Sequence, residues 1–596
     1  MKHIIHSTSG APRTGCIAAA LVLTLCMGTW GRPAHAAAPL SSSLQRALSA
    51  TEAGGTLPVW VFFTEKSDVS PAALTRAEAQ LTPHARARRE RNRDAGSLVD
   101  AYDVPVDAAA LQSLRSTGVH VRHVSRWLNA ASVDATPGNV MRIASLPGVA
   151  RLDVVHSSRT TDPEPETTPP ARAPQSSATA RLSLDYGSSY WQDVLIDVPA
   201  MHDLGYHGEG VWIAMFDTGF NIWHTAFSNL DVLITHDFVN GDSIVADQAG
   251  QMGSGFHGTL TLGAIAGYAP GELIGPAFAA TYILAKTENT NWERHIEEDA
   301  WVAAAEWADS IGVDIISSSL SYLNGFTNGE TSYTWQDMDG VTAISTIGAD
   351  IAASRGILVC NAAGNGGYVS EPANTLGAPA DGDWVFAVGA TDAGGTRSSF
   401  SSVGYTADGR IKPDIMAMGQ SVYTVNPLDS TYTTTSGTSL SCPLAAGAAA
   451  LVLQARPLAS NNMLMNALRS TASYHNTPDR LHGWGVIDAL AARNAIATGV
   501  RETPVAVTSL VAYPNPFNPR TTIDYVVVAR GRVTLTAYDV AGRRVATLVD
   551  AQEAPGHHSI SWNAVDEHGA TLASGVYLIS LESGGTRASR KVVLLK

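Results

Sequence analysis

Charge and cysteine are both scarce in this sequence, and each shortage narrows the classes of protein that it can encode. Charged residues make up 16% of the 596 residues against 45% hydrophobic ones, which excludes an intrinsically disordered chain. The formal net charge is -15, so the chain has no excess of Lys and Arg for phosphate contacts, and nucleic acid is not expected as a partner. No stretch beyond the N-terminal region is long and apolar enough to predict a transmembrane anchor.

Only four cysteines occur, and two of them, Cys16 and Cys26, lie in an apolar run near the N-terminus that we expect to be removed. The remaining two, Cys360 and Cys442, are too few for a disulfide framework in a chain of this length. They can form one bridge or lie as two small buried apolar side chains, and the second alternative is favoured.

The N-terminus has the three parts of a secretory signal peptide. Lys2 and Arg13 supply positive charge, residues 16–27 form an apolar run, and Ala34-His35-Ala36 matches an A-x-A cleavage site. The run is too short for a permanent anchor, and a short buried helix is the alternative. We therefore expect residues 1–36 to be cleaved and the mature protein to be secreted or held at the cell surface.

Residues 38–156 have the mixed pattern of a small α+β unit. Strands are predicted at 59–63, 119–131 and 149–155, and helices at 71–95, 106–116 and 140–146. Five arginines crowd the second half of the first of these helices: Arg86, Arg88, Arg89, Arg91 and Arg93. A basic run of this kind predicts a solvated helix face, and a role in processing is the alternative.

The composition changes twice more along the chain. Residues 157–183 are rich in Pro, Ser and Thr, which predicts an extended, accessible linker that proteases can cut. Residues 184–499 alternate apolar strands with helices, which predicts an α/β domain whose parallel sheet is covered by helices on both faces. Residues 505–596 contain short strands rich in Val, Thr, Tyr and Ile between turn signals, the profile of a small antiparallel β-sandwich.

Three short motifs in the α/β region carry chemistry. Asp217 follows an apolar strand, and an Asp at the carboxyl end of such a strand can accept a hydrogen bond from an imidazole. His257 lies at the predicted start of a helix. Ser439 lies at the start of another helix, whose N–H groups and dipole can stabilise an oxyanion, with Pro443 expected in its first turn. Each motif alone also has a structural explanation, such as a helix cap or a core histidine.

Together the motifs resemble those of the subtilisin-like serine protease family, over about residues 190–495. The resemblance rests on Phe216-Asp217-Thr218-Gly219, Phe256-His257-Gly258-Thr259, Asn361-Ala362-Ala363-Gly364-Asn365 and Ser436-Gly437-Thr438-Ser439, in the family's order. It implies a serine endopeptidase with Ser439 as nucleophile, His257 as general base and Asp217 as its orienting carboxylate. Asn365 would then donate to the oxyanion, and His224 falls where the family has a structural histidine.

The same resemblance implies a groove in which protein or peptide substrates bind as an added strand. Ser319, Leu320 and Ser321 would line one edge of the groove, and Ala362, Ala363 and Gly364 would line the pocket for the P1 residue. The sequence has Ser321 where the family often has Gly, and the insertion 322–340 departs from its shorter members. Broad specificity is expected, with apolar or aromatic residues at P1.

The chemistry that the resemblance implies requires no cofactor. Many members of the family bind calcium, and Asp337 and Asp339 are the candidate ligands in this sequence. Two carboxylates are too few ligands for such a site, so a polar turn before Gly340 is favoured. A structural calcium ion remains an open alternative without a clear motif.

The flanking units also resemble known parts. Residues 38–156 look like the inhibitory propeptide of subtilisin-like zymogens, which would make the chain its own first substrate, cut within 157–183. The C-terminal unit resembles the immunoglobulin-like sorting domains of type IX-secreted bacterial proteins, so secretion machinery is a candidate partner. That resemblance rests on Tyr513-Pro514-Asn515-Pro516-Phe517 and Ser574-Gly575-Val576-Tyr577.

Two other functions fit parts of the sequence. One is a surface-display or binding protein on a catalytically silent protease scaffold, which the four intact key residues disfavour. The other is an esterase or another acyl hydrolase. That function predicts a Gly-x-Ser-x-Gly elbow and the chain order Ser, Asp, His, neither of which the sequence has.

Overall fold

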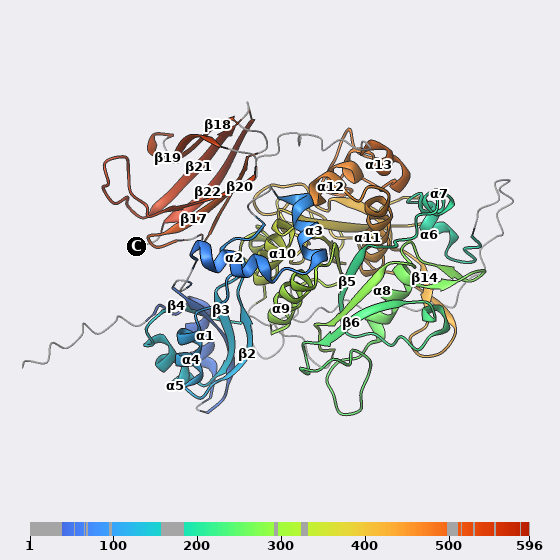
Figure 1. The fold of residues 1–596 in the computed structure, drawn as a ribbon, viewed down its shortest axis with the longest axis horizontal. Helices are drawn as coiled ribbons and strands as arrows, with labels where there is room; N and C mark the ends of the chain where they lie inside the picture. The colour runs from blue at the N-terminus through green and yellow to red at the C-terminus, as the bar shows by residue number, and fades with distance from the viewer. Residues whose placement is uncertain are drawn as a thin grey trace, which may run out of the picture.

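The computed structural model describes residues 38–155, 184–496 and 510–594, apart from 53, 65, 67–68, 94–97, 291–295, 324–331, 514, 516, 528–530, 541, 554–555 and 584–585. The predicted signal peptide and the predicted linker at 157–183 therefore lie outside the described residues. The described residues form an N-terminal, a central and a C-terminal unit, each with its own hydrophobic core (Figure 1).

The N-terminal unit is an antiparallel sheet with helices packed on one face. Its strands lie in the order β2-β3-β1-β4 and are β1 (Leu57–Phe63), β2 (His120–Ser125), β3 (Ala130–Ala135) and β4 (Val149–Val154). Its helices are α1 (Ser42–Ala50), α4 (Ala108–Arg115) and α5 (Pro137–Ala144). Strand β1 is buried along its whole length, because Val59 and Val61 lie in this unit's core, whereas Trp60 and Phe62 pack with Ile344 of the central unit.

The central unit is a parallel sheet of seven strands in the order β13-β12-β11-β10-β5-β9-β6. The strands are β5 (Trp212–Asp217), β6 (Asp231–Asp237), β9 (Thr281–Lys286), β10 (Ile315–Ser318), β11 (Leu358–Ala362), β12 (Val385–Thr391) and β13 (Ile415–Met418). Helices α8 (Phe256–Ala266) and α11 (Thr438–Ala455) cover one face, and α9 (Ile296–Ile311) and α10 (Ile344–Ser354) cover the other. This double cover explains the near-continuous apolar strands and confirms the predicted fold class.

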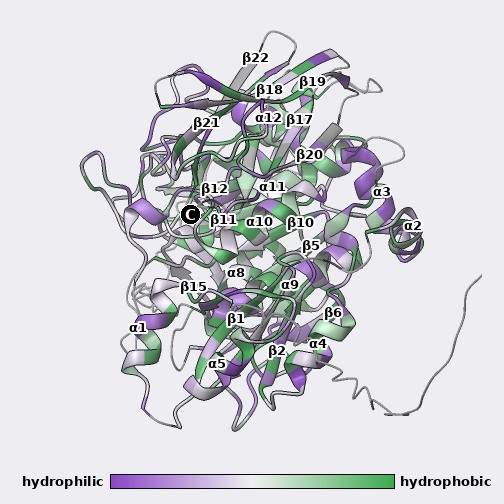
Figure 2. Ribbon diagram, turned by 90° about the vertical axis from the view of Figure 1, so that its left-hand side faces the viewer, coloured by the Kyte–Doolittle hydropathy of each residue, from purple (hydrophilic) through white to green (hydrophobic). Residues whose placement is uncertain are grey.

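Smaller elements complete the central unit. They are α6 (Tyr190–Val194), α7 (Val198–Asp203), α12 (Asn461–Ser470), α13 (Ala489–Ala495), β7 (Tyr268–Ala269), β8 (Leu273–Ile274), β14 (Val422–Val425), β15 (Tyr432–Thr435) and the short 3₁₀ turns η2 (Thr225–Phe227) and η3 (Trp335–Asp337). Figure 2 shows that the apolar residues of the molecule gather in the sheet and in the helices directly against it.

Helix α11 runs through the core and carries the candidate nucleophile. Of the helices that the structure describes, only α11 has the length and apolarity to cross a membrane, but 89% of that stretch is buried inside the protein, so α11 is a core helix. Pro443 lies in its second turn, and the expectation of a first-turn position is wrong. Because proline has no N–H, the Ser439 carbonyl has no helical donor at this position and accepts a hydrogen bond from the Ser319 hydroxyl at 2.8 Å instead.

Two further helices are inserted between β1 and α4. They are α2 (Pro71–Ala79) and α3 (Pro83–Asn92), followed by the 3₁₀ turn η1 (Ala101–Asp103). The single helix predicted over 71–95 is thus two helices, because Thr82 caps α3 and Pro83 occupies its first position. Figure 1 shows α2 and α3 apart from the N-terminal sheet, over the central unit near α10. The arginine run on α3 is not a solvated face, because Arg88 and Arg89 are buried against the central unit.

The C-terminal unit consists of two facing antiparallel sheets, as predicted. One sheet has the order β16-β17-β20 and the other β19-β18-β21-β22. The strands are β16 (Leu510–Tyr513), β17 (Thr521–Val527), β18 (Gly531–Asp539), β19 (Arg544–Glu553), β20 (Gly556–Trp562), β21 (Gly575–Ser583) and β22 (Thr586–Leu594). Strand β16 has only four residues and is defined by its pairing with β17.

Candidate active site

Asp217 and His257 meet at the carboxyl edge of the central sheet. Asp217 ends β5, His257 is the second residue of α8, and His257 Nδ1 lies 2.7 Å from Asp217 Oδ1. The Asp217 side chain is fully buried, whereas the His257 side chain is 23% exposed. A desolvated carboxylate therefore orients an imidazole that remains partly accessible.

Two further donors fix the Asp217 carboxylate. The Thr218 N–H donates to Oδ1 at 2.8 Å, and the Thr261 hydroxyl donates to Oδ2 at 3.0 Å. Gly258 allows α8 to approach this carboxylate closely, because a Cβ at Gly258 would lie only 2.1 Å from the Gly219 carbonyl oxygen. Thr261 was not predicted from the sequence, although its position four residues after His257 places both on the same helix face.

Ser439 is the second residue of α11 and lies beside the end of β10. Its hydroxyl is 3.3 Å from the Ser319 carbonyl oxygen, and its own carbonyl accepts the Ser319 hydroxyl. The residue is only 5% exposed. The N-terminus of a buried helix thus holds this hydroxyl at the same sheet edge as Asp217 and His257.

Asn365 is oriented by the residue that precedes Ser439. Its Oδ1 accepts hydrogen bonds from the Thr438 N–H at 2.9 Å and from the Thr438 hydroxyl at 3.0 Å. A Cβ at Gly437 would lie 3.6 Å from Asn365 Nδ2 and 3.7 Å from the Ser439 backbone nitrogen. Asn365 Nδ2 and the Ser439 N–H, two hydrogen-bond donors, therefore both lie close to the position that a side chain at Gly437 would take. Thr438 was missed in the sequence, although it belongs to the Ser439 motif.

The six predicted substrate-binding residues lie on neighbouring segments. Ser319, Leu320 and Ser321 follow β10, and Ala362, Ala363 and Gly364 lie at the end of β11, which pairs with β10 in parallel. The next residue after the first segment, Tyr322, is bonded to Ala378 in both directions at 2.9 Å. This pairing holds the Ser321 side chain against bare backbone: a Cβ at Gly377 would lie 1.9 Å from its hydroxyl oxygen, and one at Gly364 would lie 3.1 Å from it.

His224 has a structural position, as the resemblance implied. Its Nε2 lies 3.0 Å from the Thr431 carbonyl oxygen, and its Nδ1 accepts the Ala226 N–H at 3.1 Å. Both ring nitrogens are therefore used to fix a turn and the neighbouring loop.

The two remaining cysteines are free and buried, which confirms the favoured alternative. Burial raises the pKa of the Cys442 thiol to about 12 and raises the pKa of Cys360 well above its ordinary value. Since the thiolate is the reactive form of cysteine, neither thiol is a candidate nucleophile at neutral pH.

Asp337 and Asp339 both accept hydrogen bonds within local turns. Asp337 accepts the Thr334 N–H and hydroxyl at 2.7 Å, and Asp339 accepts the N–H groups of Val341 and Thr342 at 2.9 Å. Within the described ranges, no group of three or more His, Cys, Asp or Glu side chains is arranged to hold a metal ion.

The sequence matches a known protein family over the region that holds these residues. The model of the subtilase family matches residues 208–485, a range that contains Asp217, His257, Asn365 and Ser439. Subtilisin DY of Bacillus licheniformis is 36% identical over 300 residues, which are 50% of this chain and 96% of the relative. The chain belongs to the subtilase family. Its Ser439 motif thus lies in a protein related to known subtilisins over almost their whole length.

This subtilase also resembles subtilisin of Bacillus pumilus, at 34% identity over 52% of the chain and 98% of the relative. Subtilisin Savinase of Lederbergia lenta is 32% identical over 51% of the chain and 97% of the relative. The model of the Bacteroidota peptidase S8 propeptide domain matches residues 58–170, and that of the FlgD Ig-like domain matches residues 525–586. The protein is therefore a subtilisin-like serine endopeptidase with a propeptide domain before the protease and an immunoglobulin-like domain after it.

Proposed function

We propose that this subtilase is a secreted, self-processing endopeptidase in which Ser439, His257 and Asp217 act as a catalytic triad. The observation that carries the proposal is the 2.7 Å contact between His257 and the buried Asp217, at the sheet edge where α11 places the Ser439 hydroxyl. The subtilisin relatives make peptide bonds the expected substrate.

The residue types define the steps. His257 removes the Ser439 proton as Oγ attacks the scissile carbonyl carbon, because a serine hydroxyl is a weak nucleophile at neutral pH. His257 then gives that proton to the leaving amine as the C–N bond breaks, and an acyl group stays on Ser439. Water, activated by the same imidazole, hydrolyses the acyl-enzyme. Asp217 holds the imidazole tautomer and stabilises the imidazolium.

Two donors stabilise the negative charge that develops on the carbonyl oxygen. We assign this role to Asn365 Nδ2 and the Ser439 N–H. Thr438 donates two hydrogen bonds to the Asn365 amide oxygen, so the amide nitrogen is the end of this side chain assigned to the substrate oxygen. Loss of one such donor reduces turnover by roughly 10²–10³-fold. These groups supply the nucleophile, the base and the oxyanion donors, so the proposed chemistry requires no cofactor.

A fluorophosphonate probe tests whether Ser439 is activated. We expect the processed protein to displace fluoride and form a covalent Oγ–P bond at Ser439, located by peptide mass spectrometry, and to hydrolyse peptide p-nitroanilides. A silent binding protein would give no adduct. Hydrolysis of esters without any cleavage of peptide bonds would instead favour an acyl hydrolase.

Ser321 narrows the proposed P1 pocket. Its side chain lies against Gly364 and Gly377, so it fills space that a glycine at this position would leave open. We therefore propose broad specificity in which small apolar P1 residues are preferred to aromatic ones, a shift from the preference expected from the family resemblance alone.

Ser321→Gly is expected to raise the kcat/KM for a peptide p-nitroanilide with Phe at P1, relative to the kcat/KM for one with Ala, by about tenfold or more. A change of about one methylene in the space of an apolar pocket alters discrimination between substrates by about 10–200-fold. The measurement is the ratio of the two kcat/KM values. Ser470→Ala, which removes a hydroxyl bonded to the Ala467 carbonyl of its own helix, should leave the ratio unchanged. An unchanged ratio in Ser321→Gly would show that Ser321 does not limit this pocket.

We also propose that the protein acts outside the cell, with protein substrates and its own propeptide as partners. The C-terminal unit is proposed to serve sorting or anchoring through the secretion machinery. This unit contacts the protease through Arg590, whose guanidinium lies 3.0 Å from the Asp408 carboxylate. Asp408 belongs to a protease loop that carries none of the proposed catalytic residues.

A further inference from the structure

The insertion that carries α2, α3 and η1 makes its own contacts with the protease. We call residues 70–103 the arginine arm. Arg88 and Arg89 are 0% and 1% exposed. Arg88 donates to the Val313 carbonyl at 2.7 Å and to the Asp309 carboxylate, and Arg89 Nη2 lies 3.0 and 2.8 Å from the two Asp309 oxygens. One protease carboxylate thus receives two buried guanidinium groups.

An arginine of the protease also binds carboxylates of the arm. Arg355, which follows α10, binds Asp100 through two contacts of 2.7 Å and Asp103 at 3.3 Å. Its guanidinium also lies 5.1 Å from the ring centroid of Tyr102. Ion pairs therefore form in both directions: arginines of the arm bind a carboxylate of the protease, and an arginine of the protease binds carboxylates of the arm.

The protease backbone is shaped to receive α3. Gly312 has a φ of +114°, and a Cβ there would lie 2.5 Å from the Ala85 nitrogen, so only glycine permits this approach. Further along, His84 stacks on Trp212 at 3.9 Å between ring centroids and lies 2.9 Å from Asp314 Oδ2. The arm fits a preformed surface as well as a set of charges.

This surface lies at the edge of the sheet opposite the active site. Trp212 begins β5, Asp314 immediately precedes β10, and Arg355 precedes β11. The catalytic candidates follow the other ends of the same three strands: Asp217, Ser439 beside Ser319, and Asn365. A six-residue strand spans about 20 Å, so the arm cannot itself obstruct the substrate groove.

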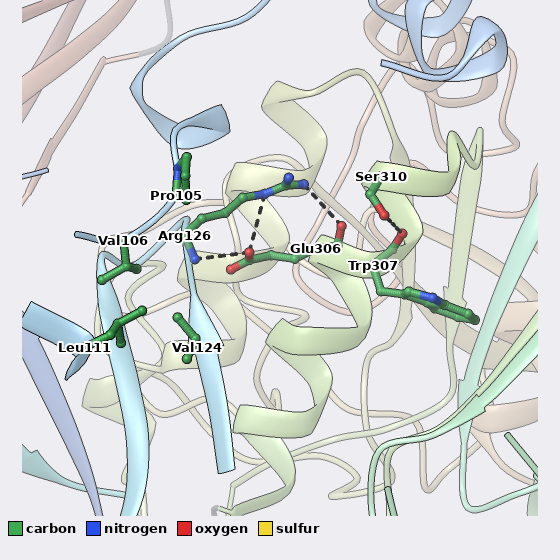
Figure 3. Close-up of a pocket in the computed structure, with 8 residues that line it drawn as sticks. All are labelled: Pro105, Val106, Leu111, Val124, Arg126, Glu306, Trp307 and Ser310. Carbon is green, nitrogen blue, oxygen red and sulfur yellow. Dashed lines mark hydrogen bonds and ion pairs between the residues drawn. The ribbon is translucent and has the colours of Figure 1, made fainter. Parts of the chain in front are cut away.

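The arm and the propeptide sheet both bind α9, because Arg126, which follows β2, also lies 3.2 Å from Asp309 Oδ2. A cavity of about 300 Å³ lies between the propeptide unit and α9, lined by Pro105, Val106, Leu111, Val124, Arg126, Glu306, Trp307 and Ser310 (Figure 3). Beside this cavity the sheet binds α9 again, because Glu306 accepts the N–H groups of Arg126 and Trp127 at 3.1 and 3.2 Å. Asp309 is therefore shared by the arm and the sheet, whereas the ion pairs of Asp314 and Arg355 are made with residues of the arm.

We infer that the arginine arm is a retention element, and that Asp309, Asp314 and Arg355 form a docking site which keeps the propeptide bound after the linker has been cut. The inference rests on the proposed function in taking the propeptide to be inhibitory. Activation then needs a second event that removes the arm, such as a further cut within it.

Mild acid is not that second event. Burial alone would raise the pKa of Asp309 and Asp314, but the surrounding cations hold both pKa values below their ordinary range. The cations are Arg88, Arg89, Arg126 and Arg355 around Asp309, and Arg91 beside Asp314, which also forms a hydrogen bond with the His84 ring. Carboxylates with a lowered pKa stabilise the complex at any pH above their ordinary value near 4 and lose that effect below it, so pH 5 should not release the arm.

The experiment uses the full-length Ser439→Ala chain with the recognition sequence of an added site-specific protease placed within 157–183. After complete cutting, the two pieces are diluted to nanomolar concentration and separated by size-exclusion chromatography at pH 8 and pH 5. We expect them to coelute at both values. Arg88→Gln with Arg89→Gln should weaken the association at least 100-fold and separate the pieces, because it leaves Asp309 buried without its two main partners. Arg76→Gln with Arg86→Gln, which makes the same charge change elsewhere on the arm, should not.

A charge-balanced variant guards against misfolding. Arg88→Gln, Arg89→Gln and Asp309→Asn together remove both sides of the network, and this protein should unfold cooperatively near the parent temperature yet still separate after cutting. Separation of the parent pieces at pH 8 or pH 5, or coelution of the charge-balanced variant at nanomolar concentration, would overturn the inference. An inactive protease gives the same readout whether or not Ser439 is the nucleophile, so this outcome is independent of the proposed chemistry.

Discussion

Ser439→Ala should abolish peptidase activity and leave the full-length precursor uncut. The substitution removes only the hydroxyl, whose contact to the Ser319 carbonyl is long at 3.3 Å, so the fold should remain intact. Loss of the nucleophile in a serine protease lowers turnover by about 10⁶-fold, because the remaining groups act only through the attacking serine. Turnover of a peptide p-nitroanilide measures the activity, and the mass of the purified chain shows whether the propeptide is still attached.

A neighbouring serine provides the matched control. Ser441 lies two residues further along α11, is also buried, and donates to the Thr438 carbonyl at 3.0 Å. Ser441→Ala should therefore keep most of the activity and still be processed. Substantial turnover in Ser439→Ala would disprove the assigned nucleophile. Clean cutting of Ser439→Ala within 157–183 in a protease-deficient host would show that another protease matures the chain.

The positions of the candidate catalytic residues in the fold could be predicted from the sequence because their signals are local. Asp217 ends an apolar strand and His257 and Ser439 begin helices, so each position follows from a few neighbouring residues. Thr261 and Thr438, which orient Asp217 and Asn365, are equally close in sequence and could have been found from helical spacing and from the Ser439 motif.

The arginine run shows what a local pattern cannot provide. Arg86 is half-exposed and paired with Glu78 within the same unit, as a solvated helix face requires. Arg88 and Arg89 lie in the same stretch of sequence, yet they are buried because they bind Asp309. That partner lies more than 200 residues away in sequence. The pattern of charges on one helix does not reveal a carboxylate on another unit, so the prediction failed where burial depended on tertiary contact. The same holds for Pro443, because the Ser439 carbonyl that it leaves without a helical donor accepts a hydrogen bond from Ser319, about 120 residues away in sequence.

Asp217→Asn should reduce kcat on the order of 10³–10⁴-fold while KM changes little. Asn fits the site, because the Thr218 N–H selects the amide oxygen at the Oδ1 position, and the Thr261 hydroxyl, which also bonds the Gly258 carbonyl, can accept from the new amide nitrogen. The imidazole of His257 thus keeps its hydrogen bond and loses only the negative charge that stabilises it when protonated. Because Asp217 is fully buried, its replacement leaves the substrate surface unaltered.

Two companion variants separate charge from orientation. Asp231→Asn makes the same chemical change at an exposed carboxylate that begins β6, and it should leave kcat unchanged. Thr261→Val keeps the Asp217 charge and removes one of its three hydrogen-bond donors, so it should lower kcat by about tenfold, the effect of one lost hydrogen bond. If Thr261→Val were as inactive as Asp217→Asn, orientation and not charge would be the main contribution of Asp217. If Asp217→Asn retained full turnover, the 2.7 Å contact with His257 would be structural, and the base that activates Ser439 would have to be sought elsewhere.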